Sequence, residues 1–232
     1  MKEDKIRDFE DKLNINLNNK KLLKRALTHK SFCNEKTELN LKNNERLEFL
    51  GDSVLSLTIS SYIFREFPQY SEGKLAKMRS IIVSAPVLSE IAAEFELGEY
   101  ILMGHGEEKT GGRTRDSILA DSLEAVLGAI YLDKGIDEVS DIIIDIFHNI
   151  IDEVSSETYI RDYKTRLQEI TQEEKARRPE YRVVNDRGPD HNKTFVVEVS
   201  FGDTILGKGE GSTIKEAEQK AAKIAYENID VL

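Results

Sequence analysis

Apolar residues recur every three or four positions through most of the first two thirds of the chain. This spacing gathers them on one face of an α-helix and therefore predicts helices. The predicted helices span residues 22–27, 47–64, 74–83, 86–95, 118–132 and 136–151. Acids alternate with Ile and Val after residue 136, so a strand is conceivable there, but the length of the segment favours a helix.

The pattern changes after about residue 154, where short alternating runs replace the helical spacing. We predict a helix over 162–174, strands over 181–185, 193–201 and 203–210, and a last helix over 214–228. The last helix has a face of small residues, Ala217, Ala221, Ala222 and Ala225. We therefore expect an all-α N-terminal domain (1–154), a linker (155–160) and a small α+β domain of order α-β-β-β-α (161–232).

Composition narrows the class of protein. The chain is 39% hydrophobic and 33% charged, which fits a folded protein, and no apolar run approaches the roughly 20 residues of a membrane helix. The charged N-terminus lacks the apolar core of a signal peptide, and the single Cys33 suits a reducing compartment, so we expect a cytoplasmic protein. A net charge of −10 lowers the expectation of a nucleic-acid partner without excluding one, because the local placement of Lys and Arg decides binding.

Three acids lie at helical spacing at the start of the helix predicted over 47–64: Glu45, Glu48 and Asp52. If the helix begins two residues earlier, all three fall on one face of it. The residues on the opposite side are apolar: Leu47, Leu50 and Val54. Neighbouring carboxylates repel one another, so water must screen them, bases must pair with them, or a divalent cation must neutralise them.

A second acidic pair, Asp121 and Glu124, occupies one face of the helix predicted over 118–132. Such a pair usually lies on a solvated surface, but this helix is so apolar that we expect the pair to be buried. Buried acids need compensation, and oxygen ligands without His or Cys suit Mg²⁺ or Mn²⁺. Ions held in this way commonly assist phosphodiester hydrolysis.

Several motifs follow one another along the chain: N-E-R-L-E-F-L-G-D-S-V-L at 44–55, and segments 26–31, 73–79, 111–113 and 117–125. In order and spacing these motifs resemble those of bacterial ribonuclease III. The stretch D-Y-K-T-R-L-Q-E at 162–169 looks like the start of that family's double-stranded RNA-binding domain. The resemblance covers nearly the whole chain.

The resemblance implies a homodimeric, Mg²⁺-dependent endoribonuclease with an all-helical catalytic domain, in which Mn²⁺ can replace Mg²⁺. Such enzymes cut both strands of duplex RNA and leave 5′-phosphates with short 3′ overhangs, and their substrates include ribosomal RNA precursors and other structured transcripts. Carried over by position, Glu48, Asp121 and Glu124 resemble metal ligands. Asp52 resembles a residue that acts in catalysis beside Glu124, and Glu45 is similar to an accessory acid.

In the second domain, duplex RNA should be recognised by shape, through phosphates and 2′-hydroxyls. The candidate contacts are Thr165, Gln168, His191, Lys215 and Lys220. The chain departs from the family at Ile214, which replaces the first of two adjacent lysines, and Glu216 and Glu218 dilute the positive charge. We therefore expect weak binding by one domain and an avidity gain in a dimer.

Other interpretations remain open at this point. The glycine-rich segment 104–115 contains Lys109, Arg113 and Arg115 and is either a flexible surface loop or an RNA contact; it is a poor phosphate-binding loop. His29 and Cys33 lack the third group of a nucleophilic site, so we interpret both as structural. The rival functions are a non-catalytic double-stranded RNA-binding protein and a nuclease for DNA or single strands, the latter opposed by the C-terminal domain.

Overall fold

The computed structural model describes residues 3–156, 163–175, 178–188, 193–202 and 204–228. The chain divides into two compact units, Met1–Ser156 and Glu157–Leu232. Most of the expected linker, residues 157–160, lies outside the described residues, whereas Ser155 still belongs to the preceding helix. None of the described helices is both long enough and apolar enough to cross a membrane.

The first unit is entirely helical, as the apolar spacing predicts. Its elements are α1 (Glu3–Lys12), α2 (Lys20–Ala26), α3 (Lys30–Glu35), η1 (Thr37–Leu39), α4 (Glu45–Glu66), α5 (Glu72–Ile82), α6 (Ala85–Glu94), η2 (Leu97–Glu99), α7 (His105–Lys109), η3 (Gly112–Thr114), α8 (Asp116–Lys134) and α9 (Ile136–Ser155). Each of the six helices predicted from the sequence is present. The segment 137–151 is helical, so its alternation of acids with Ile and Val reflects one buried face and one exposed face of α9.

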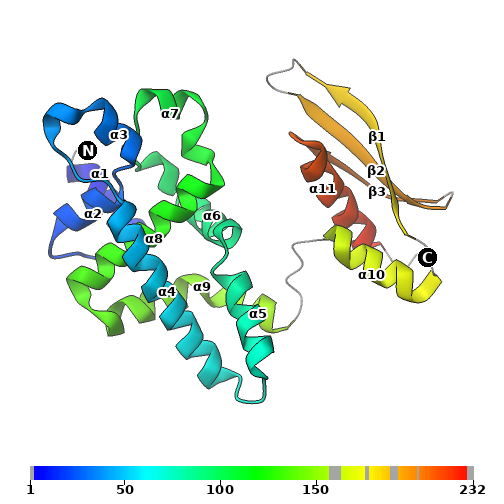
Figure 1. The fold of residues 1–232 in the computed structure, drawn as a ribbon, viewed down its shortest axis with the longest axis horizontal. Coiled ribbons are helices and arrows are strands. Elements are labelled where there is room, and N and C mark those ends of the chain that lie inside the picture. Colours follow the sequence, from blue (N-terminus) through cyan, green and yellow to red (C-terminus); the bar gives the residue numbers. More distant parts are fainter. Residues whose placement is uncertain (1–2, 157–162, 176–177, 189–192, 203, 229–232) are drawn as a thin grey trace. The chain divides into compact units, whose positions relative to one another are not determined.

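The core of this unit is built around α8, which packs against α2, α4, α6 and α9 (Figure 1). The buried side chains of α8 include Leu123, Val126 and Ile130, which surround the helix because neighbours cover it on several sides. On α4, Leu47 and Val54 are buried as predicted, whereas Leu50 is only partly covered and Phe49 is 78% exposed.

Helices α1, α3 and α7 were not predicted from the sequence, and two of these regions show why. The first is α1, whose Ile6 and Phe9 are buried although the segment is highly charged. The second is segment 104–115, interpreted from the sequence as either a flexible surface loop or an RNA contact, which contains α7 and η3. Both Glu35 carboxylate oxygens accept backbone hydrogen bonds at the start of α7, from His105 N at 2.9 Å and Gly106 N at 3.1 Å. A carboxylate in this place satisfies amides that the helix itself leaves unpaired.

The second unit has the predicted α-β-β-β-α order. Its elements are α10 (Tyr163–Lys175), β1 (Glu180–Arg187), β2 (Thr194–Phe201), β3 (Thr204–Gly211) and α11 (Ile214–Glu227). The strands form one antiparallel sheet in the order β1-β2-β3, and α10 and α11 lie on the same side of it (Figure 1). A core of aliphatic residues and alanines, including Leu167, Val197 and Val199, joins the helices to the sheet.

The small-residue face of α11 lies directly on strand β3. Ala217, Ala221 and Ala225 are fully buried, and a Cβ added to Gly209 would stand 2.3 Å from the backbone nitrogen of Ala221. That distance is too short for any side chain at this position of the strand. The alanine face and the strand glycines therefore allow one close contact between helix and sheet.

Candidate metal centre

Three carboxylates from two helices meet at one place on the helical unit. Glu48 comes from the first turn of α4, and Asp121 and Glu124 come from successive turns of α8. One oxygen of each side chain can be chosen so that the three oxygens lie within 4.8 Å of one another. Residues some 70 positions apart in the sequence thus form one cluster, which neither helix could form alone.

Two glycines explain why α4 and α8 approach so closely here. A Cβ on Gly51 would stand 1.8 Å from the carbonyl oxygen of Glu124, and a Cβ on Gly128 would stand 2.3 Å from the carbonyl oxygen of Leu47. The helices therefore touch backbone to backbone within one turn of the acids. Both glycines lie inside the acidic motifs, but their spacing alone did not reveal this contact.

The pKa values of the clustered acids reflect burial and mutual repulsion. Burial, followed by the charges of Asp52, Asp121 and Glu48, raises the pKa of Glu124 to about 8. Burial and the neighbouring Asp121 also raise the pKa of Glu48, and loss of solvent raises that of Asp121. The prediction that Asp121 and Glu124 form a buried pair was wrong, since Asp121 is exposed and Glu124 only half-buried. The acids lie at the edge of the core, where a polymer can reach them.

The other two candidate acids of α4 lie beside the cluster. Asp52 is exposed one turn beyond Glu48, and its charge acts on Glu124, but it contributes no oxygen to the three-carboxylate group. Glu45 is held away from the cluster by two partners. Its Oε1 accepts from Lys30 Nζ at 3.3 Å and its Oε2 from Asn43 Nδ2 at 2.9 Å, which together lower its pKa.

The donor set fits a hard divalent cation. All the candidate ligands are carboxylate oxygens, as such ions prefer, and burial together with three neighbouring acids raises the pKa of Glu124. A bound cation would relieve this repulsion. Partial exposure of the acids leaves room for water and a phosphate to complete the coordination.

The two arginines of segment 104–115 form hydrogen bonds and ion pairs within the protein. Arg113 donates to the carbonyl oxygens of Gly98 and Ile101, at 2.6 and 3.2 Å, and pairs with Glu108. Arg115 pairs with Glu107. These contacts favour a structural role for both arginines over the alternative of RNA contact, and leave Lys109 exposed.

The candidate RNA contacts of the second unit lie on its two helices. Thr165 is exposed and Gln168 half-buried on α10, and Lys215 is exposed on α11. Lys220 is also exposed but pairs with Glu216 at 2.6 Å. The fifth candidate, His191, lies outside the described residues, so the structure gives no position for it.

The same Glu216 forms a small network at the start of α11. Its Oε2 accepts from the backbone nitrogen and the hydroxyl of Ser212, both at 2.8 Å. Lys220 and Ser212 together lower the pKa of Glu216 to about 2. A fixed negative charge therefore sits beside a lysine that is a candidate phosphate ligand.

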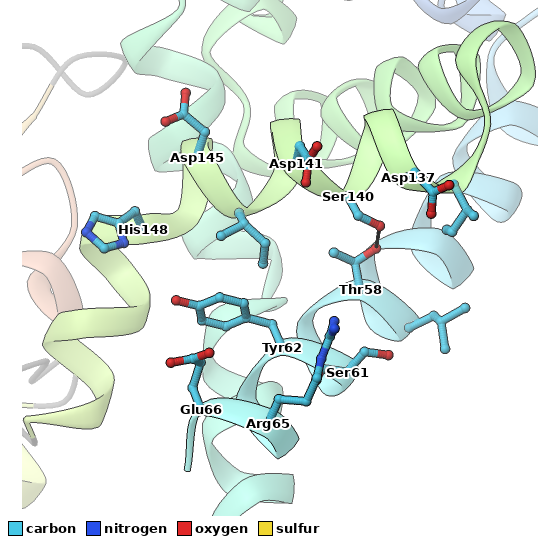
Figure 2. A pocket seen from close by; sticks show the side chains of 13 residues that line it. Thr58, Ser61, Tyr62, Arg65, Glu66, Asp137, Ser140, Asp141, Asp145 and His148 are labelled. Carbon is cyan, nitrogen blue, oxygen red and sulfur yellow. Dashed lines mark hydrogen bonds between the residues drawn. The ribbon is translucent and has the colours of Figure 1, made fainter.

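A groove of about 890 Å³ lies between α4 and α9, away from the candidate acids. Figure 2 shows Thr58 and Ser140 joined by a 3.0 Å hydrogen bond between the two helices. The lining residues are Leu57, Thr58, Ser61, Tyr62, Arg65 and Glu66 from α4, and Ile136, Asp137, Ser140, Asp141, Ile144, Asp145 and His148 from α9. The apolar and polar pattern of the two helices does not predict this groove.

Comparison with protein families gives a match for each unit. Residues 19–154 match the model described as ribonuclease-III-like, and residues 163–229 match the double-stranded RNA binding motif. The matched ranges correspond to the helical unit with its acidic cluster and to the α-β-β-β-α unit.

Curated proteins and solved structures agree with these matches. The chain is 49% identical to "Ribonuclease 3" of Caldanaerobacter subterraneus, with 97% of this chain and 98% of the relative covered. It is also 49% identical to "Ribonuclease 3" of Clostridium tetani, over 97% and 95% of the two chains. A solved nuclease domain of ribonuclease III from Campylobacter jejuni is 42% identical, with a TM-score of 0.58, and covers 62% of this chain and 96% of that one.

Proposed function

The chain belongs to the ribonuclease III family of metal-dependent endonucleases that cleave double-stranded RNA, and we propose that Glu48, Asp121 and Glu124 hold its catalytic metal ion. The observation that carries the proposal is the convergence of these three carboxylates, with oxygens within 4.8 Å, at the contact of α4 and α8. We propose Mg²⁺ as the ion, with Mn²⁺ as a substitute, because both take oxygen ligands and retain water.

The five acids divide into three roles in this proposal. Glu48, Asp121 and Glu124 would hold the ion, which when bound makes water more acidic and stabilises negative charge on phosphate oxygens. Asp52, whose charge already acts on Glu124, is placed to orient the attacking water by a hydrogen bond at its exposed carboxylate. Glu45 lies one turn before Glu48 and keeps the accessory role expected from the sequence.

The direct test is Glu124→Gln, incubated with duplex RNA and Mg²⁺. We expect a loss of cleavage of at least about 100-fold with the fold retained, because the amide keeps the shape but removes the charge that holds the cation. Glu94→Gln, at an exposed acid of α6, is the matched control and should cleave like the unmodified enzyme. Wild-type cleavage by a folded Glu124→Gln protein would refute the assignment.

We propose that Thr165, Gln168, Lys215, Lys220 and His191 contact the RNA from the second unit. An exposed lysine at the start of a helix, as Lys215 is on α11, suits a phosphate, and the family match covers this unit. Ile214 is 45% exposed, so Ile214→Lys should add a positive charge without opening the core and should strengthen RNA binding. Unchanged affinity of this variant would argue against phosphate contact at the start of α11.

We also infer a homodimer formed through α4. Phe49, Leu57 and Phe64 lie on the same side of this helix and are 78%, 58% and 70% exposed. Large apolar side chains grouped on a surface commonly mark an interface. The solved Campylobacter jejuni relative is described as a nuclease domain with a region involved in dimer formation. Sedimentation that gives only monomer at micromolar concentration would contradict the inference.

The products and cellular setting follow from the same proposal. We propose that cleavage leaves 5′-phosphates and short 3′ overhangs, and that structured transcripts, including ribosomal RNA precursors, are the substrates. Sequencing of the ends of cleaved duplexes tests the first statement, and accumulation of unprocessed precursors on depletion of the enzyme tests the second. A cytoplasmic location is consistent with a chain whose single cysteine, Cys33, is a free thiol.

A further inference from the structure

A positive side chain stands at the edge of the acidic cluster. Lys30 is the first residue of α3, and its Nζ lies 3.3 Å from Oε1 of Glu45, one turn before Glu48 on α4. The charge of Lys30 also acts on Glu48 and Asp121 and opposes the rise of their pKa values. The ammonium group is therefore near the proposed metal ligands as well as near Glu45.

The backbone around Lys30 is firmly anchored. Thr28 O accepts from Asn44 N at 2.9 Å, which joins this segment to the start of α4. His29 N donates to Leu102 O at 3.0 Å, and the Ser31 hydroxyl accepts from Gly104 N at 2.9 Å. These contacts on both sides of Lys30 hold its backbone beside the start of α4, while its side chain is 59% exposed.

The ion pair of Lys30 is not a structural bond of the core. The side chains of Lys30 and Glu45 are 59% and 52% exposed, and pairs in such an environment contribute little to stability. An exposed lysine can exchange a carboxylate for a phosphate at little cost. Asn43 remains on the other oxygen of Glu45 and can hold this carboxylate when Lys30 leaves.

A lysine in this position would reduce the electrostatic repulsion between the RNA phosphates and the acids. A phosphate that reaches Glu48, Asp121 and Glu124 approaches a cluster of like charge on a chain of net charge −10. We propose that Lys30 binds a phosphate of the RNA strand at the edge of the acidic cluster, and that Glu45 holds the ammonium group there until RNA arrives. The inference rests on the proposed function, because it takes the cluster as the place of cleavage.

The test measures RNA binding without cleavage. Full-length protein with Glu124→Gln is titrated with a short RNA duplex in chelator at several salt concentrations, with and without Lys30→Gln. We expect affinity to fall about fivefold near physiological salt, and the slope of log affinity against log salt to become shallower by about 0.9, as for one lost phosphate contact. Lys30→Arg should restore both quantities, and Lys36→Gln, at an exposed lysine of the same segment, should change neither.

A second variant should change the RNA affinity in the opposite direction. Glu45→Gln should strengthen RNA binding, since it removes the carboxylate that competes for Lys30, and both variants should melt at the same temperature as their parent because the pair is exposed. If Lys30 only compensates the acids, Lys30→Gln will leave the RNA affinity and salt slope unchanged, and the proposal is overturned. Because no cleavage is measured, this failure is distinct from wild-type cleavage by Glu124→Gln, which would refute the proposed function.

Discussion

Substitution of Gly51 by alanine should damage the proposed metal centre without changing any carboxylate. The added Cβ would stand 1.8 Å from the carbonyl oxygen and 2.5 Å from the carbonyl carbon of Glu124. Non-bonded carbon and oxygen atoms in proteins approach to about 3.3 Å, so the two backbones must separate by roughly 1.5 Å at this point. Both obstructing atoms are backbone, and no rotamer change can relieve the contact.

The separation acts on stability and on activity. Overfilling a packed contact typically costs about 1–3 kcal/mol, and each kcal/mol lowers the melting temperature of a chain this size by about 2–4 °C. Glu48, on α4, would move relative to Glu124, on α8, and a shift of about 1 Å in a catalytic arrangement can cost about 100-fold in rate. We therefore expect Gly51→Ala to lose about 100-fold or more of its cleavage rate, with a melting temperature lower by roughly 2–12 °C.

The assays are thermal melting followed by circular dichroism, and single-turnover cleavage of duplex RNA over a range of Mg²⁺ concentrations. Gly73→Ala is the matched control, because Gly73 lies in helix α5 with no atom within 4 Å of the added Cβ. It should keep wild-type cleavage and gain up to about 1 kcal/mol from the better helix former. If Gly51→Ala matched this control in both assays, the contact between α4 and α8 would not determine the geometry of the site.

Three further predictions concern charge and assembly. The folded, metal-free protein has the pKa of Glu124 raised from 4.5 to about 8, so it binds this proton more tightly than the unfolded chain, and its stability should fall as pH rises between these values. In chelator, the melting temperature of the wild type should fall as pH rises, and that of Glu124→Gln should fall less. Added Mg²⁺ should raise the melting temperature of the wild type more at high pH. Equal pH profiles of the two proteins would refute the raised pKa of Glu124. Phe49→Ser should weaken self-association in sedimentation by about 1.5–3 kcal/mol for each copy, with unchanged monomer stability, since the side chain is 78% exposed; an unchanged dimer would place the interface elsewhere. Glu216→Gln should release Lys220 for phosphate and steepen the salt dependence of RNA binding by about 0.9, and an unchanged slope would show that Lys220 does not reach the RNA.

The long helices could be predicted from the sequence because their apolar spacing extends over several turns. Helix α7 could not, since its five residues lie between glycines and its start depends on the distant Glu35 carboxylate. Helix α1 offered a signal that was missed, because Ile6 and Phe9 keep helical spacing within a charged segment and both are buried.

The candidate residues of the site could be predicted from the sequence, but their burial and the packing of α4 against α8 could not. The spacing of Asp121 and Glu124 indicates one helix face, whereas their meeting with Glu48 depends on packing between helices, and only the family resemblance suggested it. The expected burial was wrong because an apolar helix can still present one edge to solvent, as α8 does at Asp121. The close contact at Gly51 and Gly128 arises from backbone geometry, which the pattern of apolar and polar residues does not encode.

The separation of the half-exposed acids from the groove between α4 and α9 has a consequence for inhibitor discovery. A chelating compound at the acids would depend on the metal ion for most of its affinity and would discriminate poorly among metalloenzymes. The groove between α4 and α9, about 890 Å³ with apolar side chains such as Leu57 and Ile144 beside polar ones, offers a surface for a compound that does not contact the acids. If the partner subunit binds α4 as proposed, a compound in this groove would compete with it, and the potency of the compound should fall as enzyme concentration rises.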